Sequence, residues 1–327
     1  MTQLDNRPPA DVTVPGPGRR TDQAFSTIVF CAGMTVLAVL ALILISTGIE
    51  AFPIFQYSGL EFIFGQRWAP NDPDLPVFGT LTFFYGTAVS SLVGLLIAVP
   101  VSIGIALFLT ELAPRWLKVP AITVIDLLAA VPSVVFGLVG VLVIGPALFP
   151  AYQWIHDLVV DIPVLNAVFG PAVNGNTFAT AGLILAVMVI PIITSISREV
   201  FDTVPLADKQ AAYALGATRW EMIKGAVFPH SFGGLVGGAM LGLGRAMGET
   251  IAVTLVIGGS TQITANLFSS GNSMAAVIAQ QWGESSGLHT NALIGIGVVL
   301  FAITVIVNYA ARVIVRRAEI RMKGAAA

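Results

Sequence analysis

Apolar residues run along this chain in long blocks separated by short polar stretches. Among these blocks, residues 23–49, 75–110, 162–197 and 285–311 contain no Asp, Glu, Lys or Arg. Each exceeds the roughly 20 apolar residues that a helix needs to cross the hydrocarbon core of a bilayer. The pattern predicts an all-α membrane protein with six transmembrane helices, near 25–48, 80–110, 120–148, 178–197, 232–260 and 291–315.

Composition supports burial in a bilayer. Of the 327 residues, 56% are hydrophobic and only 10% are charged, and the mean hydropathy is +0.86. Soluble domains average about 25% charged residues. This mixture could not cover a water-exposed surface, so a soluble globular protein is excluded.

The two ends of the chain are polar and flank the membrane domain. Residues 1–23 are rich in Pro and Gly and are expected to form a disordered cytoplasmic tail. Residues 24–315 form the predicted membrane domain, and residues 316–327 a cytoplasmic C-terminal tail. The apolar stretch 24–48 is too long for the hydrophobic region of a signal peptide, which favours a retained first helix.

Basic residues set the predicted orientation. With six spans, 14 of the 16 Lys and Arg residues fall on one side of the membrane, Arg67 lies on the other, and Arg245 lies within a helix. Cytoplasmic loops carry an excess of Lys and Arg. Both termini are therefore expected in the cytoplasm, together with the basic residues Arg7, Arg19, Arg20, Arg115, Lys118, Arg198, Lys209, Arg219, Lys224, Arg312, Arg316, Arg317, Arg321 and Lys323.

The segments expected outside the cell are rich in apolar and aromatic residues. Residues 49–79 contain several aromatic residues, and residues 149–177 include an amphipathic run from Trp154 to Ile162. Such segments are typical of helices that lie at the membrane interface, and a docking surface for an outside partner is the alternative. Residues 272–283 could form a further short lateral helix.

The cytoplasmic loop 198–231 carries signals for two short helices. Asp202 or Thr203 can cap the first helix, with Pro205 in its opening turn. Gly216 lies where a helix end needs a left-handed residue.

The second helix of this loop has its own start and stop signals. Thr218 and Glu221 have the spacing of a capping box, and Pro229 is expected to end the helix before the next span. The loop is therefore either an ordinary ordered connection or a lever that contacts a soluble partner.

This loop resembles the EAA loop of ABC importer permeases. Gln210, Ala211 and Ala212 are followed after three residues by Gly216 and, further on, by Pro229, and this spacing matches the family pattern in full. The resemblance implies that the loop binds an ATP-hydrolysing subunit. Gln210 stands where the family has Glu, and Ala226 and Phe228 replace Ile and Leu.

Two charges lie inside the predicted fifth span. Gly234, Gly238 and Gly242 recur every four residues, a pattern that lets helices approach closely. Continued by steps of three and four, the same face reaches Arg245 and Glu249, which are four residues apart and able to pair. A charge in the bilayer centre costs at least ~2.5–3.5 kcal/mol on insertion scales. The two residues either neutralise each other and hold helices together, or they take part in transport.

Under the transport hypothesis, Arg245 receives an anion in a translocation path. The fork of donors on Arg suits tetrahedral oxyanions. Glu249 could accept a hydrogen bond from protonated phosphate, which sulfate cannot offer, so Glu249→Gln is expected to lose discrimination. Thr87 and Ser133 are further candidates for lining the path.

The fifth span narrows the resemblance further. The run LGLGRAMGET around Arg245 is similar to that of the permease subunits of bacterial phosphate-specific ABC importers, as are Tyr85-Gly86-Thr87, Ala98-Val99-Pro100 and the run from Asp126 to Ser133. The matches cover roughly residues 80–320. The resemblance implies a type I importer permease that moves inorganic phosphate across the inner membrane by alternating access, with Arg245 and Glu249 linked to transport.

The same resemblance implies the partners. A homologous permease, ATPase subunits and an outside phosphate-binding protein are expected, together with the lipid bilayer and no nucleic acid. The chain contains no Gly-Lys dipeptide and so no P-loop, which predicts that ATP and Mg²⁺ are bound by the partner ATPase and that the chain itself is not an enzyme. No cofactor, metal site or catalytic residue is expected here. The alternatives are an ABC permease for molybdate or sulfate and, less favoured, an ATPase-independent secondary transporter.

Overall fold

The computed structural model describes residues 19–72 and 75–325. Within them, six helices are long and apolar enough to cross a membrane, as predicted. They cover Thr21–Ser58, Leu81–Leu112, Ser133–Val159, Phe178–Asp202, Arg219–Gly248 and Leu288–Val313. The described part of the chain is thus a multi-pass membrane protein.

The chain divides into two compact units, residues 1–49 and 50–327. Helix α1 (Arg19–Ser58) begins in the first unit, and none of its most apolar stretch is buried. Residues 1–18 of the expected disordered tail lie outside the described residues. The expectation was wrong for residues 19–23, which already belong to α1, because the apolar run favours helix up to its polar edge.

Helices α3 (Leu81–Leu107) and α8 (Phe178–Asp202) run parallel through the core of the second unit. Glycines let them approach closely: a Cβ on Gly182 would lie 2.4 Å from Val93 Cγ1. The Ser102 hydroxyl also donates to the carbonyl of Ile190 across 3.2 Å. Small residues at such contacts are typical of helix packing in membranes.

The predicted third span, 120–148, is interrupted. Helix α4 (Arg115–Ala129) ends before Pro132, and a new helical run then crosses from Ser133 to Val159. Proline has no N–H to donate and disfavours helical backbone in the residue before it, which explains the break. The second run comprises α5 (Ser133–Val139), the π-helical turn η2 (Gly140–Ile144) and α6 (Gly145–Val159).

The predicted fifth span, 232–260, was wrong at both ends. It begins earlier, since α10 (Arg219–Met222), the π-helical turn η3 (Ile223–Val227) and α11 (Phe228–Gly248) form one continuous run. Pro229 therefore does not end a helix. It occupies the first turn of α11, where the π-helical turn before it accommodates a proline without an N–H. The span breaks at Glu249, and α12 (Ile251–Val256) follows.

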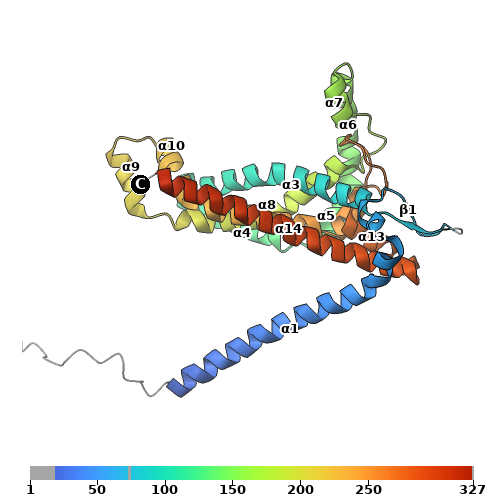
Figure 1. The fold of residues 1–327 in the computed structure, drawn as a ribbon. Helices are drawn as coiled ribbons and strands as arrows, with labels where there is room; N and C mark the ends of the chain where they lie inside the picture. The colour runs from blue at the N-terminus through green and yellow to red at the C-terminus, as the bar shows by residue number, and fades with distance from the viewer. Residues whose placement is uncertain (1–18, 73–74, 326–327) are drawn as a thin grey trace, which may run out of the picture. The chain divides into compact units, whose positions relative to one another are not determined.

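The opposite end of the second unit from α9 holds several short elements (Figure 1). They are α2 (Glu61–Phe64), the antiparallel strands β1 (Trp68–Ala69) and β2 (Val77–Phe78), α7 (Pro163–Val168), α13 (Met274–Gln281) and η4 (Trp282–Glu284). Helix α13 confirms the short helix expected within 272–283, and its lateral orientation stays a prediction. That residues 49–79 and 149–177 lie at the membrane interface, or instead form a docking surface for an outside partner, stays a prediction. Helix α14 (Leu288–Ala325) extends through most of the expected C-terminal tail, 316–327, so that tail is helical up to Ala325.

At the other end lies α9 (Leu206–Ala214), beside the π-helical turn η1 (Phe108–Leu112) that ends the second span. A buried apolar cluster holds this end together, with half-buried Ala212 of α9 packed against it. Its buried members are Ala106, Phe201, Val204, Met222, Ile223, Val227 and Leu235.

Candidate functional site

Arg245 lines a groove between α11 and α14. The groove has a volume of about 750 Å³, and Arg245 is exposed within it. No carboxylate of the described residues pairs with its guanidinium, and its lining contains no acidic side chain. An exposed guanidinium without a carboxylate partner can bind an oxyanion through its fork of donors.

The glycine face of α11 packs against α8 and continues toward Arg245. Gly238 and Gly242 pack against Ile196 and Ile193 of α8, which confirms the close-approach seam. At about 100° per residue, Arg245 lies within about 20° of Gly238, seven residues earlier. Gly234 of the seam also lines the groove that Arg245 faces, which supports the prediction that Arg245 continues the glycine face.

Glu249 lies just past the end of α11, in extended backbone at φ −69° and ψ 125°. Its side chain is buried, and Oε1 accepts a hydrogen bond from the backbone N–H of Ala252 at 3.3 Å. The predicted helical pairing of Arg245 with Glu249 does not form, because the helix ends between them. Glu249 instead caps the first turn of α12.

Ser133 begins α5, and Glu249 lies two residues before α12. Helix α12 packs against α5 so closely that a Cβ on Gly137 would lie 2.8 Å from Cα of Ala252. Helices α5 and α12 thus lie side by side, and each follows a break in its span.

Thr87 lies apart from these residues. It is buried on α3, where its hydroxyl donates to the carbonyl of Phe83 at 2.9 Å and accepts from the N–H of Met274 at 2.9 Å. These two hydrogen bonds attach the start of α13 to α3. The structure does not bring Thr87 together with Arg245, and the role of Thr87 in a path stays a prediction.

Helix α9 presents two different faces. Leu206, Gln210 and Tyr213 are exposed on one, whereas Lys209 and Ala212 are half-buried on the other. Ala211 is also exposed, and Gly216 follows with a positive φ of 81°, as its position predicts. The exposed face, extended by Leu215 and Trp220, is large and apolar enough to suit a protein partner.

Of the two helix caps predicted in this loop, one forms and the other does not. Thr218 and Glu221 form the predicted capping box, with Glu221 Oε2 accepting from the N–H of Thr218 at 2.8 Å. Neither Asp202 nor Thr203 caps α9, since Pro205 itself is the residue that precedes its first turn. The Thr203 hydroxyl donates backwards instead, to the carbonyl of Val200 at 2.7 Å.

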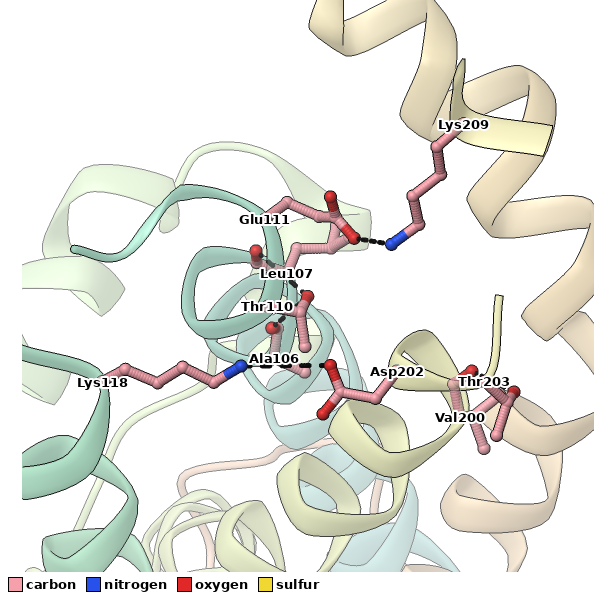
Figure 2. Close-up of polar contacts among 9 residues, drawn as sticks. All are labelled: Ala106, Leu107, Thr110, Glu111, Lys118, Val200, Asp202, Thr203 and Lys209. Atoms are coloured by element: carbon pink, nitrogen blue, oxygen red, sulfur yellow. Dashed lines mark hydrogen bonds and ion pairs between the residues drawn. The ribbon is translucent and has the colours of Figure 1, made fainter. Parts of the chain in front are cut away.

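Two ion pairs join the elements at the α9 end (Figure 2). Lys209 Nζ lies 2.5 Å from Glu111 Oε1, and both side chains are largely buried. Lys118 Nζ lies 3.9 Å from Asp202 Oδ1, and that pair is more exposed. The first pair connects α9 to the end of the second span, and the second connects α4 to the end of α8.

Sequence reasoning missed several of these polar residues. Asn308 and Arg312 of α14 line the same groove as Arg245. Arg312 had only been counted among the basic residues of the cytoplasmic side. Glu111 could have been noticed, because it is the first charge after the uncharged block 75–110. Within residues 19–72 and 75–325, no three His, Cys, Asp or Glu residues are grouped as a metal site requires.

Comparison with known proteins identifies the class. Residues 98–320 match the family described as "Binding-protein-dependent transport system inner membrane component". This match covers more than half of the chain, and the chain therefore belongs to that family of membrane transport subunits.

Within this class, several similar curated proteins carry the printed name Phosphate transport system permease protein PstC. That of Xylella fastidiosa (strain Temecula1) is 40% identical over 316 residues, covering 94% of this chain and 96% of the relative. That of Haemophilus influenzae is 41% identical over 290 residues, covering 88% and 90%. Among solved structures, an inward-facing MetNI methionine ABC transporter aligns with a TM-score of 0.49 and 17% identity, over 73% of this chain and 94% of that one.

Proposed function

We propose that this chain is the membrane-spanning permease subunit of an ATP-driven importer that carries inorganic phosphate across the inner membrane. The observation that carries the proposal is the 40% identity to phosphate permeases over 94% of the chain. The groove around Arg245 supports it, since it offers an unpaired guanidinium to an oxyanion.

The chain would act with partners. A PstA-like permease would complete the path, PstB-like ATPase subunits would bind ATP and Mg²⁺, and a PstS-like protein would deliver phosphate. The full sequence lacks the Gly-Lys of a P-loop, which supports ATP binding by another subunit. The concentration of Lys and Arg on one side supports cytoplasmic positions for both termini.

Coupling to ATP hydrolysis would pass through the exposed face of α9. Gln210 and Ala211 lie on the surface of this helix, and Gly216 and Pro229 fix the turn and the helix that follow it. Ala212 joins α9 to the apolar cluster beneath it. Movement of the ATPase would thereby shift α9 and alternate access to the path.

Within the membrane, Arg245 would bind the anion, Glu249 would tune selectivity and Ser133 would line the path. A carboxylate accepts a hydrogen bond from protonated phosphate but gains nothing from sulfate, which has no proton to donate. Glu249→Gln retains an oxygen that can cap α12, so this change removes the charge and leaves the cap. Uptake by this variant is expected to be inhibited more strongly by sulfate than uptake by the wild type.

The test is uptake of radiolabelled phosphate by vesicles that hold the complete complex. Arg245→Gln should abolish uptake while the subunits still copurify. The matched control is Arg67→Gln, which removes an exposed arginine from the other end of the molecule. Normal uptake by Arg245→Gln would overturn the anion role, and wild-type transport of molybdate or sulfate in place of phosphate would overturn the substrate.

A further inference from the structure

The second span ends in a widened helical turn that carries Glu111. In η1 the N–H of Ala113 donates to the carbonyl of Phe108 at 2.7 Å, five residues back. The Thr110 hydroxyl donates to the carbonyl of Ala106 at 3.0 Å (Figure 2). Turns of this kind occur as single units within α-helices and are frequent at functional sites. Here the turn holds the carboxylate of Glu111 toward α9.

The ion pair of Glu111 with Lys209 is short and sheltered. Its atoms lie 2.5 Å apart, and the side chains are only 10% and 17% exposed, respectively. Removing one partner of a sheltered pair leaves an uncompensated charge, which is strongly unfavourable. The neighbouring pair of Lys118 with Asp202 is 3.9 Å long with side chains 35% and 57% exposed, and exposed pairs of that kind contribute little.

Lys209 shares its face of α9 with Ala212, three residues on. Residues three apart are neighbours on a helix surface. Ala212 packs against the apolar cluster that includes Ala106 of α3 and Phe201 of α8. One face of α9 is therefore held at two points, by the ion pair with Glu111 of η1, which continues α3, and by apolar contact with the cluster, while the opposite face remains exposed.

We propose that the Glu111–Lys209 ion pair is the strut that transmits displacement of α9 to α3, and that ATP-driven transport depends on it. This inference rests on the proposed function, because it takes α9 as the helix that the ATPase moves. Both residues are positioning residues, since neither contacts solute. Without the pair, α9 could move under the ATPase while α3 stays in place, so hydrolysis would continue with little import.

The experiment measures molecules imported per ATP hydrolysed, with the assembled complex in proteoliposomes. Glu111→Gln should retain the ATPase and its hydrolysis but lower this ratio about tenfold, the size of effect expected when a strongly coupled pair is broken. The double variant Glu111→Lys with Lys209→Glu should restore the ratio. Asp202→Asn is the matched control, because it breaks the more exposed ion pair at the same end and should leave the ratio unchanged.

Each outcome decides the proposal. A wild-type ratio in Glu111→Gln would overturn it, as would a double variant that assembles but remains uncoupled. The second result would instead indicate that Lys209 contacts the ATPase directly. If Glu111→Gln does not assemble, the ratio of the double variant alone decides. If the wild-type complex imports another oxyanion, the proposed substrate is wrong and the same ratio is measured with that oxyanion.

Discussion

Replacing Gly86 by alanine tests how tightly the α13 end is packed against α3. A Cβ at Gly86 would lie 1.9 Å from the carbonyl oxygen of Asn272 and 2.9 Å from its carbonyl carbon. Both atoms belong to backbone, so no side-chain rotation relieves the overlap. Asn272 is itself held by the hydrogen bond from its Nδ2 to Gln280 Oε1, at 2.9 Å.

The magnitude follows from two opposing effects. Forcing an extra carbon into a packed site costs about 1–3 kcal/mol, with the upper end expected when backbone must move. Replacing Gly by Ala within a helix gains about 1 kcal/mol. The net loss for Gly86→Ala should be about 2 kcal/mol, which corresponds to a fall of about 4–8 °C in Tm at the 2–4 °C per kcal/mol of larger domains.

The assay is thermal unfolding of the purified complex at one heating rate, followed by tryptophan fluorescence. Gly104→Ala is the matched control on the same helix, because a Cβ at Gly104 meets nothing within 4 Å. That variant should be as stable as the wild type or more so. If Gly86→Ala unfolds at the same temperature as Gly104→Ala, the close approach of Gly86 to Asn272 does not limit stability and the reasoning fails.

Three further changes test local contacts. Thr87→Val should destabilise the protein by about 1–3 kcal/mol, because the buried N–H of Met274 loses its acceptor, whereas Thr87→Ser should have a small effect in the same unfolding assay. Gly216→Ala should cost about 1–2 kcal/mol, since alanine disfavours the left-handed backbone, and Gly216→Asn should recover part of this loss. Thr218→Ala should cost about 1 kcal/mol by removing a helix cap, and hydrogen exchange at the amide of Glu221 should rise about fivefold; unchanged exchange would contradict the capping role.

Much of the fold could be predicted because the bilayer dictates the length of the apolar blocks. The six spans, the short helix within 272–283 and the capping box at Thr218 follow from local patterns. Prolines were less informative. Pro132 interrupts a span, whereas Pro100, Pro191 and Pro229 lie inside helices, where neighbouring structure satisfies the freed backbone groups.

The candidate site was predictable only in part. The motif around Arg245 drew attention to the right residues, but not to their arrangement, because the helix ends at Gly248 without a proline. Helix α12 follows this end and packs against α5, and no local pattern reports that packing. The pair of Glu111 with Lys209 joins positions 98 residues apart, so it too needed the folded structure.

The paired breaks before α5 and α12 also bear on the fate of the chain inside a cell. Gly248 and Pro132 are both exposed in the isolated subunit. Lipid offers no hydrogen bonds to backbone groups freed at such breaks, whereas a second subunit or a water-filled path does. A chain synthesised in excess of its partner would leave these groups facing hydrocarbon. The exposed breaks would then make the unassembled chain a substrate for proteolysis, so the abundance of the chain should follow that of the partner.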